Sequence, residues 1–541
     1  MNKYSGSLLV VALIIVASVI LTPKASVNNN SSASFAEQVI EEKKEPHQPL
    51  PAPSVEVEML RRDISGFLDG TRLRSAKWSV MVVSLDMGDT LFARNENLQV
   101  TPASNMKIVT TAAALYFLGP SFKYQTFLFG DGPIENGHLR GDLILYGTGD
   151  PGISDRFFPT RTRVFEGLAK QLVAEGITHI DGDIVGDATY FSGPALGPEW
   201  NPKDFNERFA APVSSISFNE NVVTLRISPA NRLGGVPTVE TIPYGFNFET
   251  HNTAKTVSGR PRPKLWLDRP TPTSTARIAG EITHGGPAIW RRLTVPDPAL
   301  FAVQALKRTL VSNNITVGGN LISVHRSDLS KITGKKTWSP GIMKEKEPRI
   351  LARHTSPEII EYLKVVNHES HNLFAESIFK TIGKIVVGQG SFQGGSRAIR
   401  NFTVGEIGLS DNELVSADGS GFSHNNQTTA GGLVKILWYM SGSPQWNNFV
   451  STLPEAGRSL RRMYRTQAAR NLRAKTGTIE RVSGLTGLVS ARNGEKLLFS
   501  IISNNVPSTS SAKRVEDRIG SRLANFWRST PDSSRILSSD Q

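Results

Sequence analysis

The chain has 541 residues, a length that suggests three or four domains of ~150 residues each. Hydrophobic residues make up 39% and charged residues 20%, which excludes a disordered chain, and no Gly-x-y repeat makes it fibrous. The net charge of +13 is spread along the chain without blocks, and the absence of cysteine excludes disulfide scaffolds, cysteine nucleophiles and thiolate metal sites.

The first 25 residues have the form of an export signal. Lys3 is followed by a strongly apolar run of about 14 residues, Leu8 to Leu21. A spanning helix needs ~20 apolar residues, so an uncleaved membrane anchor over residues 7–22 is the alternative to a cleaved signal peptide. We therefore expect an exported protein of the periplasm or cell envelope, with possible N-terminal membrane association. Export makes nucleic acid an unsuitable partner for the basic chain.

The segment 26–54 is composed of Asn, Ser, Pro and charged residues and is typical of a linker. The pattern changes at Val55, where apolar residues recur at helical spacing until Gly70. Trp78–Leu85 and Thr90–Phe92 are predicted strands joined by a turn at Gly88. An Ala-rich helix is predicted over Asn105–Leu118.

From about 125 to 354 the pattern indicates short strands, including Leu143–Tyr146 and Ile184–Val185, with one helix over Arg163–Ala174. Helices return after 355, where Ser356-Pro357-Glu358 is a good helix start. We therefore predict an α+β domain, residues 55–125 and 355–528, interrupted by a β-rich inserted region over 126–354.

The last part of the chain contains the strongest hairpin signal, Asn493-Gly494, between the predicted strands Gly484–Ser490 and Lys496–Asn504. A closing helix is expected over Arg514–Trp527, and residues 529–541 are predicted to be a disordered tail.

Two common motifs do not fit their usual function. Gly147 to Gly152 matches G-x-G-x-x-G, but Asp150-Pro151 forms a turn where a dinucleotide site needs a helix. His368 and His371 are three positions apart, whereas zinc-binding helices of metalloproteases place their histidines four apart. Neither motif therefore predicts a dinucleotide site or a metalloprotease zinc site.

A serine and lysine constellation remains. Ser104 and Lys107 form S-x-x-K at the start of a helix, where a spacing of three places both on one face. The helix N-terminus favours developing negative charge at the serine. Lysine acts as a base only if its pKa falls, through burial or a neighbouring cation, and Lys475 of Lys475-Thr476-Gly477 is a candidate for that cation. The hairpin that follows predicts an edge strand, where the Thr478 N–H could face a substrate carbonyl.

The S-x-x-K pattern alone has little specificity, because it recurs at Ser377 and Ser510, whereas K-T-G occurs once. The information lies in the order of three motifs, with Ser370-His371-Asn372 between the other two.

These motifs resemble those of penicillin-binding proteins and serine β-lactamases. The flanking residues are similar to one branch, the class C low-molecular-mass D-alanyl-D-alanine carboxypeptidases/endopeptidases typified by penicillin-binding protein 4. The segments that carry this resemblance, which runs from about 55 to 528, are Thr101–Lys107, Asn367–Glu376, Asp418–Gly421 and Ala474–Thr478. The resemblance implies a serine β-lactamase/transpeptidase-like domain, an antiparallel sheet with helices. His371 departs from the usual Asp, at a position where the backbone does most of the positioning.

By this resemblance, the chain hydrolyses peptidoglycan stem peptides and cross-links through an acyl-enzyme and is inhibited covalently by β-lactams. Ser104 attacks the penultimate D-Ala carbonyl, and Lys107 takes its proton. The resemblance implies a proton relay for Ser370, substrate amide binding for Asn372 and carboxylate binding for Lys475 and Thr476. It also implies substrate binding at Gly477 and an oxyanion hole formed by the N–H groups of Ser104 and Thr478. No metal and no organic cofactor is needed by this resemblance. The alternatives are a serine β-lactamase and a catalytically inactive peptidoglycan-binding protein, and the oligomeric state stays open.

Asp204 is the last candidate. Its surroundings resemble the stretch in which relatives carry an acid that faces the free amine of the stem peptide's diaminopimelate or lysine. A carboxylate suits this task, since charge-assisted hydrogen bonds are about twice as strong as neutral ones. The alternatives are Glu199 or Glu207 in the same role, or a surface acid in a turn.

Overall fold

The computed structural model describes residues 54–70, 73, 75–243, 249–259, 264–270, 273, 275–333 and 348–529. The expected export signal or anchor, almost all of the linker and residues 530–541 of the tail lie outside these residues. The chain divides into two compact units, Met1–Glu58 and Met59–Gln541. In the described part of the chain, no helix combines the length and the apolar character needed to cross a membrane.

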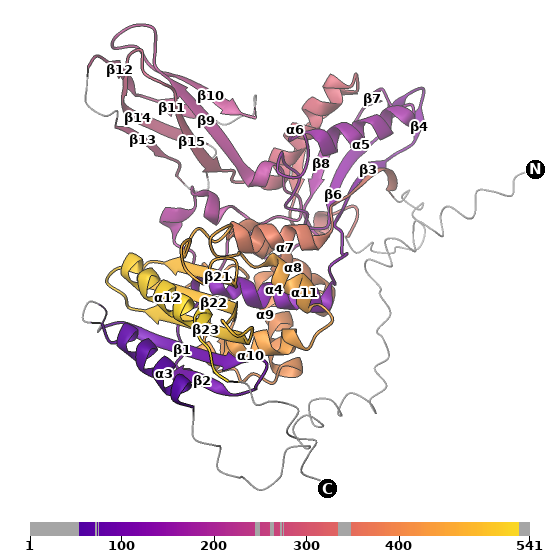
Figure 1. Cartoon of the computed structure of the whole chain (residues 1–541). Coiled ribbons are helices and arrows are strands. Elements are labelled where there is room, and N and C mark those ends of the chain that lie inside the picture. Colours follow the sequence, from indigo (N-terminus) through magenta and orange to yellow (C-terminus); the bar gives the residue numbers. More distant parts are fainter. Residues whose placement is uncertain are drawn as a thin grey trace, which may run out of the picture. The chain divides into compact units, whose positions relative to one another are not determined.

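A five-stranded antiparallel sheet joins the two ends of the second unit, in the order β2-β1-β23-β22-β21 (Figure 1). Its strands are β1 (Lys77–Ser84), β2 (Thr90–Arg94), β21 (Leu472–Ile479), β22 (Val482–Ser490) and β23 (Lys496–Asn504). Val80 of β1 pairs with Ile501 of β23, so the sheet is completed by segments from opposite ends of the chain. The predicted hairpin is confirmed, with Gly494 at φ +89° in its turn. Strand β21 lies at the edge, as predicted.

Helices enclose this sheet, and α10 contacts β1 and β23 while α12 contacts β22. The helices with residues in this part of the unit are α3 (Val55–Leu68), α4 (Met106–Phe117), α7 (Ile359–His368), α8 (Asn372–Val387), α9 (Phe392–Arg400), α10 (Ala430–Ser441), α11 (Trp446–Thr452) and α12 (Thr509–Ala524). Helix α4 is buried from Met106 to Leu115 because its alanines let α8 and α10 approach it closely.

Three helix starts differ from the prediction. A 3-10 turn, η2 (Ala103–Asn105), precedes α4 and contains Ser104. Helix α7 begins at Ile359, because the Ser356 hydroxyl accepts a hydrogen bond from the Tyr124 N–H and does not cap a helix. Helix α12 begins at Thr509, five residues before the predicted start, because the Ser508 side chain caps the Ser511 N–H.

The region between the two catalytic segments is β-rich, as predicted, with a core of its own. One sheet has the order β17-β8-β6-β3-β18 and another β16-β7-β5-β4. These strands are β3 (Gln125–Asp131), β4 (Ile134–Glu135), β5 (His138–Leu139), β6 (Asp142–Gly147), β7 (His179–Ile180), β8 (Ile184–Asp187), β16 (Thr316–Val317), β17 (Leu321–Val324) and β18 (Arg349–Thr355). The predicted strands around 143 and 184 and the helix α5 (Arg163–Ala174) are confirmed.

Two further sheets belong to the same region, in the orders β10-β9-β15 and β11-β14-β12, with β13 beside β14. Their strands are β9 (Val222–Ser228), β10 (Thr238–Ile242), β11 (Thr250–Asn252), β12 (Lys255–Val257), β13 (Leu265–Asp268), β14 (Ala276–Thr283) and β15 (Ile289–Thr294). Helix α6 (Pro298–Ser312), which the sequence did not predict, is capped by Asp297, whose side chain accepts from the Leu300 N–H.

The first and last strands of this region pair with each other. Thr355 at the end of β18 pairs with Gln125 at the start of β3, so the chain leaves and returns at adjacent points. Such a closure lets a domain accept a long insertion without disturbing its own sheet. We propose on this basis the domain limits 55–125 with 355–528 for the catalytic part and 126–354 for the insertion.

Candidate active site

Ser104 lies in the 3-10 turn η2 at the start of α4, half-buried, with the fully buried Ala103 before it. Ala103 has φ +48°, a left-handed conformation that L-residues adopt only when the surroundings enforce it. Gly421 packs tightly against this turn, because a Cβ there would lie 1.8 Å from the Ala103 carbonyl oxygen. The serine is therefore held by a strained, tightly packed turn.

Lys107 follows Ser104 by one helical turn and is fully buried. Its Nζ donates to Ser104 Oγ at 2.9 Å, to Asn372 Oδ1 at 2.8 Å and to the Ser420 carbonyl oxygen at 2.7 Å. Burial lowers the pKa of Lys107 to about 7, against the opposing effect of the acids Glu376 and Asp418. A hydroxyl beside an amine with such a pKa is an activated nucleophile.

Lys475 brings a second serine into the site. Its Nζ donates to Ser370 Oγ at 3.0 Å and to its neighbour's carbonyl, Thr476 O, at 2.7 Å. Ser370 has φ +55° in the short connection between α7 and α8. Burial, followed by the charge of Lys107, lowers the pKa of Lys475 well below its usual value. Of the two causes that the sequence suggests for a low pKa of Lys107, burial is the main one, and the contribution of Lys475 stays a prediction.

Asn372, the first residue of α8, joins the site to the inserted region. Its Oδ1 accepts from Lys107, and its Nδ2 donates to the Phe209 carbonyl at 2.9 Å. The preceding His371 points elsewhere, with Nε2 at 3.0 Å from Glu220 Oε2. Glu220 also pairs with Arg156 at 2.7 Å and with Arg208 at 2.7 Å. His371 therefore belongs to an ion-pair network with the inserted region, outside the row of Ser104, Lys107 and Asn372.

Glu376 and Asp418, to which the sequence assigned no role, hold backbone groups of the site in place. Glu376 accepts the Gly419 and Ser420 N–H groups at 2.8 Å each, which orients the Ser420 carbonyl toward Lys107. Burial and the charge of Asp418 raise the pKa of Glu376 to about 8. The signal that could have revealed this role is the presence of acids in otherwise apolar or Gly-rich segments.

Thr476, Gly477 and Thr478 continue along the edge strand β21. Gly477 is buried, and a Cβ there would lie 2.7 Å from the Pro102 carbonyl and 2.6 Å from Asn105 Nδ2. Gly477 thus permits the close approach of β21 to the nucleophile turn. Thr476 is half-buried and Thr478 exposed, so both are accessible to a substrate. The assignment of the Thr478 N–H to an oxyanion hole stays a prediction.

Asp204 ends the 3-10 turn η3 (Pro202–Asp204) and is half-buried. The segment that carries it is attached to the site at both ends, through Trp200 Nε1, which donates to Asp418 Oδ2 at 3.0 Å, and through the Phe209 carbonyl described above. Glu199 and Glu207 are exposed on the same segment.

The chain is similar to known proteins over most of its length. A family model described as the D-Ala-D-Ala carboxypeptidase 3 (S13) family matches residues 60–526. A D-alanyl-D-alanine carboxypeptidase of Actinomadura sp. (strain R39) is 30% identical over 495 residues, which are 88% of this chain and 87% of that protein.

Two crystal structures of penicillin binding protein 4 from Haemophilus influenzae share the fold at 21% identity. The first has a TM-score of 0.72 and covers 85% of this chain and 98% of its own. The second, a complex with a β-lactam, has a TM-score of 0.67 and covers 84% and 98%. The predicted α+β, transpeptidase-like fold with a β-rich insertion is thereby confirmed.

We expect Asp418→Ala to lower the free energy of unfolding by about 3 kcal/mol or more, because each stranded buried donor costs about 1–3 kcal/mol. The stranded groups include the Gly421 and Ser423 N–H groups, now at 2.8 and 2.6 Å from its carboxylate. Urea unfolding measures the loss. The control is Asp411→Ala, which removes a surface acid paired with Arg400 and should change little. Equal losses in the two variants would contradict the buried role.

Proposed function

Because the chain belongs to the D-Ala-D-Ala carboxypeptidase 3 (S13) family, we propose that Ser104 is the nucleophile of a serine-type D-alanyl-D-alanine carboxypeptidase acting on peptidoglycan stem peptides. The observation that carries the assignment is the contact of 2.9 Å between Ser104 Oγ and the buried Lys107 Nζ. The same chemistry cleaves a cross-link whose acyl donor is D-Ala, so we extend the proposal to endopeptidase action.

Lys107 suits the role of base because its surroundings accommodate both protonation states. A lysine ammonium has three N–H donors, and three acceptors surround this one. The neutral amine keeps two donors for Asn372 and Ser420 and directs its lone pair at Ser104. Deprotonation therefore leaves no acceptor stranded and aims the base at the nucleophile.

In the acylation step, Ser104 Oγ bonds to the carbonyl carbon of the penultimate D-Ala while its proton passes to Lys107 Nζ. The tetrahedral oxyanion is received by the N–H groups of Ser104 and Thr478, and one such donor contributes about 3–4 kcal/mol to lowering the barrier. The C–N bond then breaks, and the terminal D-Ala leaves with the proton that Ser370 relays to its amine. Water releases the acyl group and restores Ser104.

Asn372 and Thr476 bind the substrate directly, and Lys475 acts without touching it. Asn372 Nδ2 exchanges its hydrogen bond to the Phe209 carbonyl for one to the substrate amide. Lys475 is fully buried and cannot touch the substrate. It acts through its hydrogen bond to Ser370 and through the electrostatic potential that it creates in the site. The half-exposed Thr476 touches the terminal carboxylate directly.

A β-lactam enters by the same route, because its strained amide presents a carbonyl to Ser104 and its carboxylate to Thr476. The β-lactam complex of the Haemophilus influenzae relative supports this part of the proposal. Membership of a carboxypeptidase family speaks against a β-lactamase, and the Ser104–Lys107 and Ser370–Lys475 pairs speak against an inactive binding protein.

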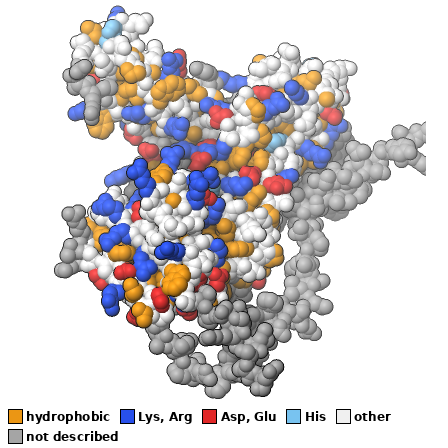
Figure 2. Space-filling model, viewed as in Figure 1, with side chains coloured by type: hydrophobic (Ala, Val, Ile, Leu, Met, Phe, Trp, Pro, Cys, Tyr) orange, Lys and Arg blue, Asp and Glu red, His pale blue; other side chains and the backbone are white. Residues whose placement is uncertain are grey.

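We also propose that the chain acts outside the cytoplasmic membrane, where peptidoglycan lies, and that residues 1–25 direct export. The distribution of Lys and Arg over the visible face (Figure 2) fits a basic surface with no single concentrated block.

Ser104→Ala should abolish covalent labelling by penicillin and the release of D-Ala from a stem pentapeptide, because it removes the hydroxyl that lies 2.9 Å from Lys107 Nζ at the start of α4. Intact-mass measurement detects the adduct, and mass spectrometry of the digest detects D-Ala. Ser510→Ala is the matched control, since Ser510 begins an exposed S-x-x-K elsewhere and should keep one adduct per chain. An adduct that persists in Ser104→Ala would refute the assignment.

The rate of penicillin acylation should rise with pH and level off above about 7. Only neutral Lys107 accepts the serine proton, and its pKa lies at about 7, so the neutral fraction falls about tenfold for each pH unit below that value. Stopped-flow acylation between pH 5.5 and 9 measures the profile, with far-UV circular dichroism to confirm folding. A flat profile through pH 7 would exclude Lys107 as the titrating base.

Asp204→Asn should slow hydrolysis of a stem peptide with a free side-chain amine by about tenfold, and leave the N-acetylated peptide and penicillin acylation nearly unchanged. The expected loss reflects one charge-assisted hydrogen bond of about 1.5 kcal/mol. Glu207→Gln, an exposed acid on the same segment, is the control for general charge effects. If both peptides slow equally in Asp204→Asn, the residue supports the segment and does not read the amine.

A further inference from the structure

Three side chains that could ligate a metal converge in the inserted region, on elements that carry none of the catalytic residues. His138 of β5 pairs with His179 of the parallel strand β7, and Asp181 follows two positions after His179. The Asp181 N–H donates to the Leu139 carbonyl, which extends the ladder. Leu139 and Ile180 are fully buried, so the alternation of a strand places His138, His179 and Asp181 together on the outer face.

The distances between their donor atoms fit one ion. One atom from each side chain lies within 4.8 Å of the other two. His138 Nδ1 lies 2.9 Å and His179 Nε2 lies 3.4 Å from the same Asp181 Oδ1. Ligands at 2.0–2.1 Å around a tetrahedral ion are about 3.3 Å apart, so small side-chain shifts suffice to bind one.

The outer partners of these side chains orient them as in a metal site. His179 Nδ1 lies 2.5 Å from Thr316 Oγ1. If Nδ1 carries the proton and donates it to Thr316, the lone pair of Nε2 is free to bind a metal on the side of Asp181. Arg140 Nη1 donates to Asp181 Oδ2 at 2.6 Å, which turns Oδ1 toward the histidines. The position is accessible, since the side chains of His138 and His179 are 39% and 30% exposed.

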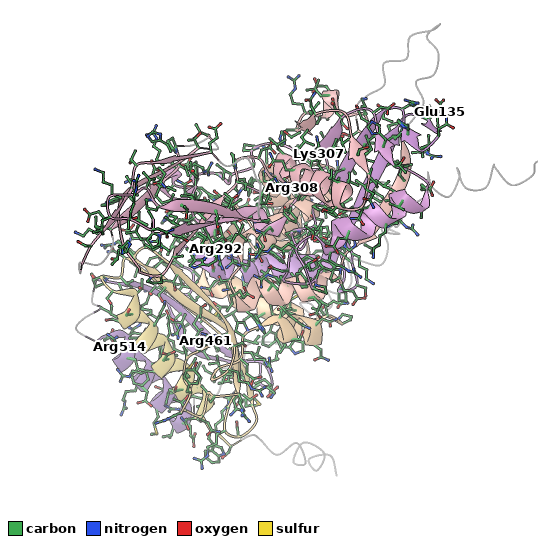
Figure 3. All side chains as sticks on the ribbon, turned by 90° about the horizontal axis from the view of Figure 1, so that it is seen from above. Glu135, Arg292, Lys307, Arg308, Arg461 and Arg514 are labelled. Atoms are coloured by element: carbon green, nitrogen blue, oxygen red, sulfur yellow. The ribbon has the colours of Figure 1, made fainter. Side chains whose placement is uncertain are left out.

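We propose that His138, His179 and Asp181 form a zinc site, with water completing the coordination. Two imidazoles and one carboxylate suit Zn²⁺, whereas Mg²⁺ and Ca²⁺ require oxygen ligands. The competing possibility is a surface ion-pair cluster, in which Arg140 and the histidines only neutralise Asp181. Glu135 of β4, labelled in Figure 3 at the outer end of this region, pairs with Arg140. The site has no step in the proposed peptidase reaction.

The test is calorimetric titration of the untagged full chain with ZnCl₂. We expect about one Zn²⁺ per chain, bound at least tenfold more weakly by His138→Ala and by His179→Ala. Thr316→Val, which removes only the partner of His179, should weaken binding by about tenfold. His251→Ala is the matched control, because His251 is an exposed strand histidine of β11 outside the cluster. MgCl₂ in excess should not compete.

Substitution with Co²⁺ gives a second readout, an absorption band of a tetrahedral site that disappears in His179→Ala. Penicillin acylation should be the same in all four variants, which shows that they are folded. Zinc binding that is absent, or that is unchanged in the double variant His138→Ala with His179→Ala, would overturn the proposal and leave the ion-pair cluster. Neither result bears on the role of Ser104.

Discussion

The catalytic part of the molecule depends on one buried lysine with three acceptors. Lys107 is fully covered, and its partners come from its own turn, from the start of α8 and from the segment before α10. A buried amine without acceptors would be strongly destabilising, so these three segments have to meet at one point. The same burial lowers the pKa of Lys107 to about 7. Stability of the fold and reactivity of the serine therefore have a common origin.

The supporting groups show how such a site is held in place. Glu376 and Asp418 do not contact the nucleophile, but they fix the loop from Gly419 to Ser423 through its N–H groups. That loop supplies one acceptor to Lys107 and presses Gly421 against the strained Ala103. The left-handed Ala103, which precedes Ser104, lies in this tight packing. Side chains distant from the reaction thus set the direction of Ser104.

The inserted region also takes part in the site. Its Phe209 carbonyl accepts from Asn372, and its Glu220 pairs with His371. The motif Ser370-His371-Asn372 is therefore held in part by residues of the inserted region. The replacement of the family's usual Asp by His at 371 finds its explanation here, since the imidazole reaches the carboxylate of Glu220. The antiparallel pairing of β3 with β18 gives this region a short, rigid connection to the catalytic part.

The sequence by itself determined the elements with local signals: the Asn493-Gly494 hairpin, the helix Arg163–Ala174 and the order of the three motifs. It also predicted Ser104, Lys107, Ser370, Asn372 and Lys475 as site residues by their resemblance to a family pattern, and the fold brings Ser104, Lys107 and Asn372 together and Ser370 beside Lys475. It did not reveal Glu376 and Asp418 as supports, the Asn372–Phe209 contact, or which of burial and a neighbouring cation lowers the pKa of Lys107. These depend on contacts between residues far apart in the chain and on the exclusion of water. Only the packed tertiary structure decides both, because local propensity carries no information about which distant side chain will cover an amine.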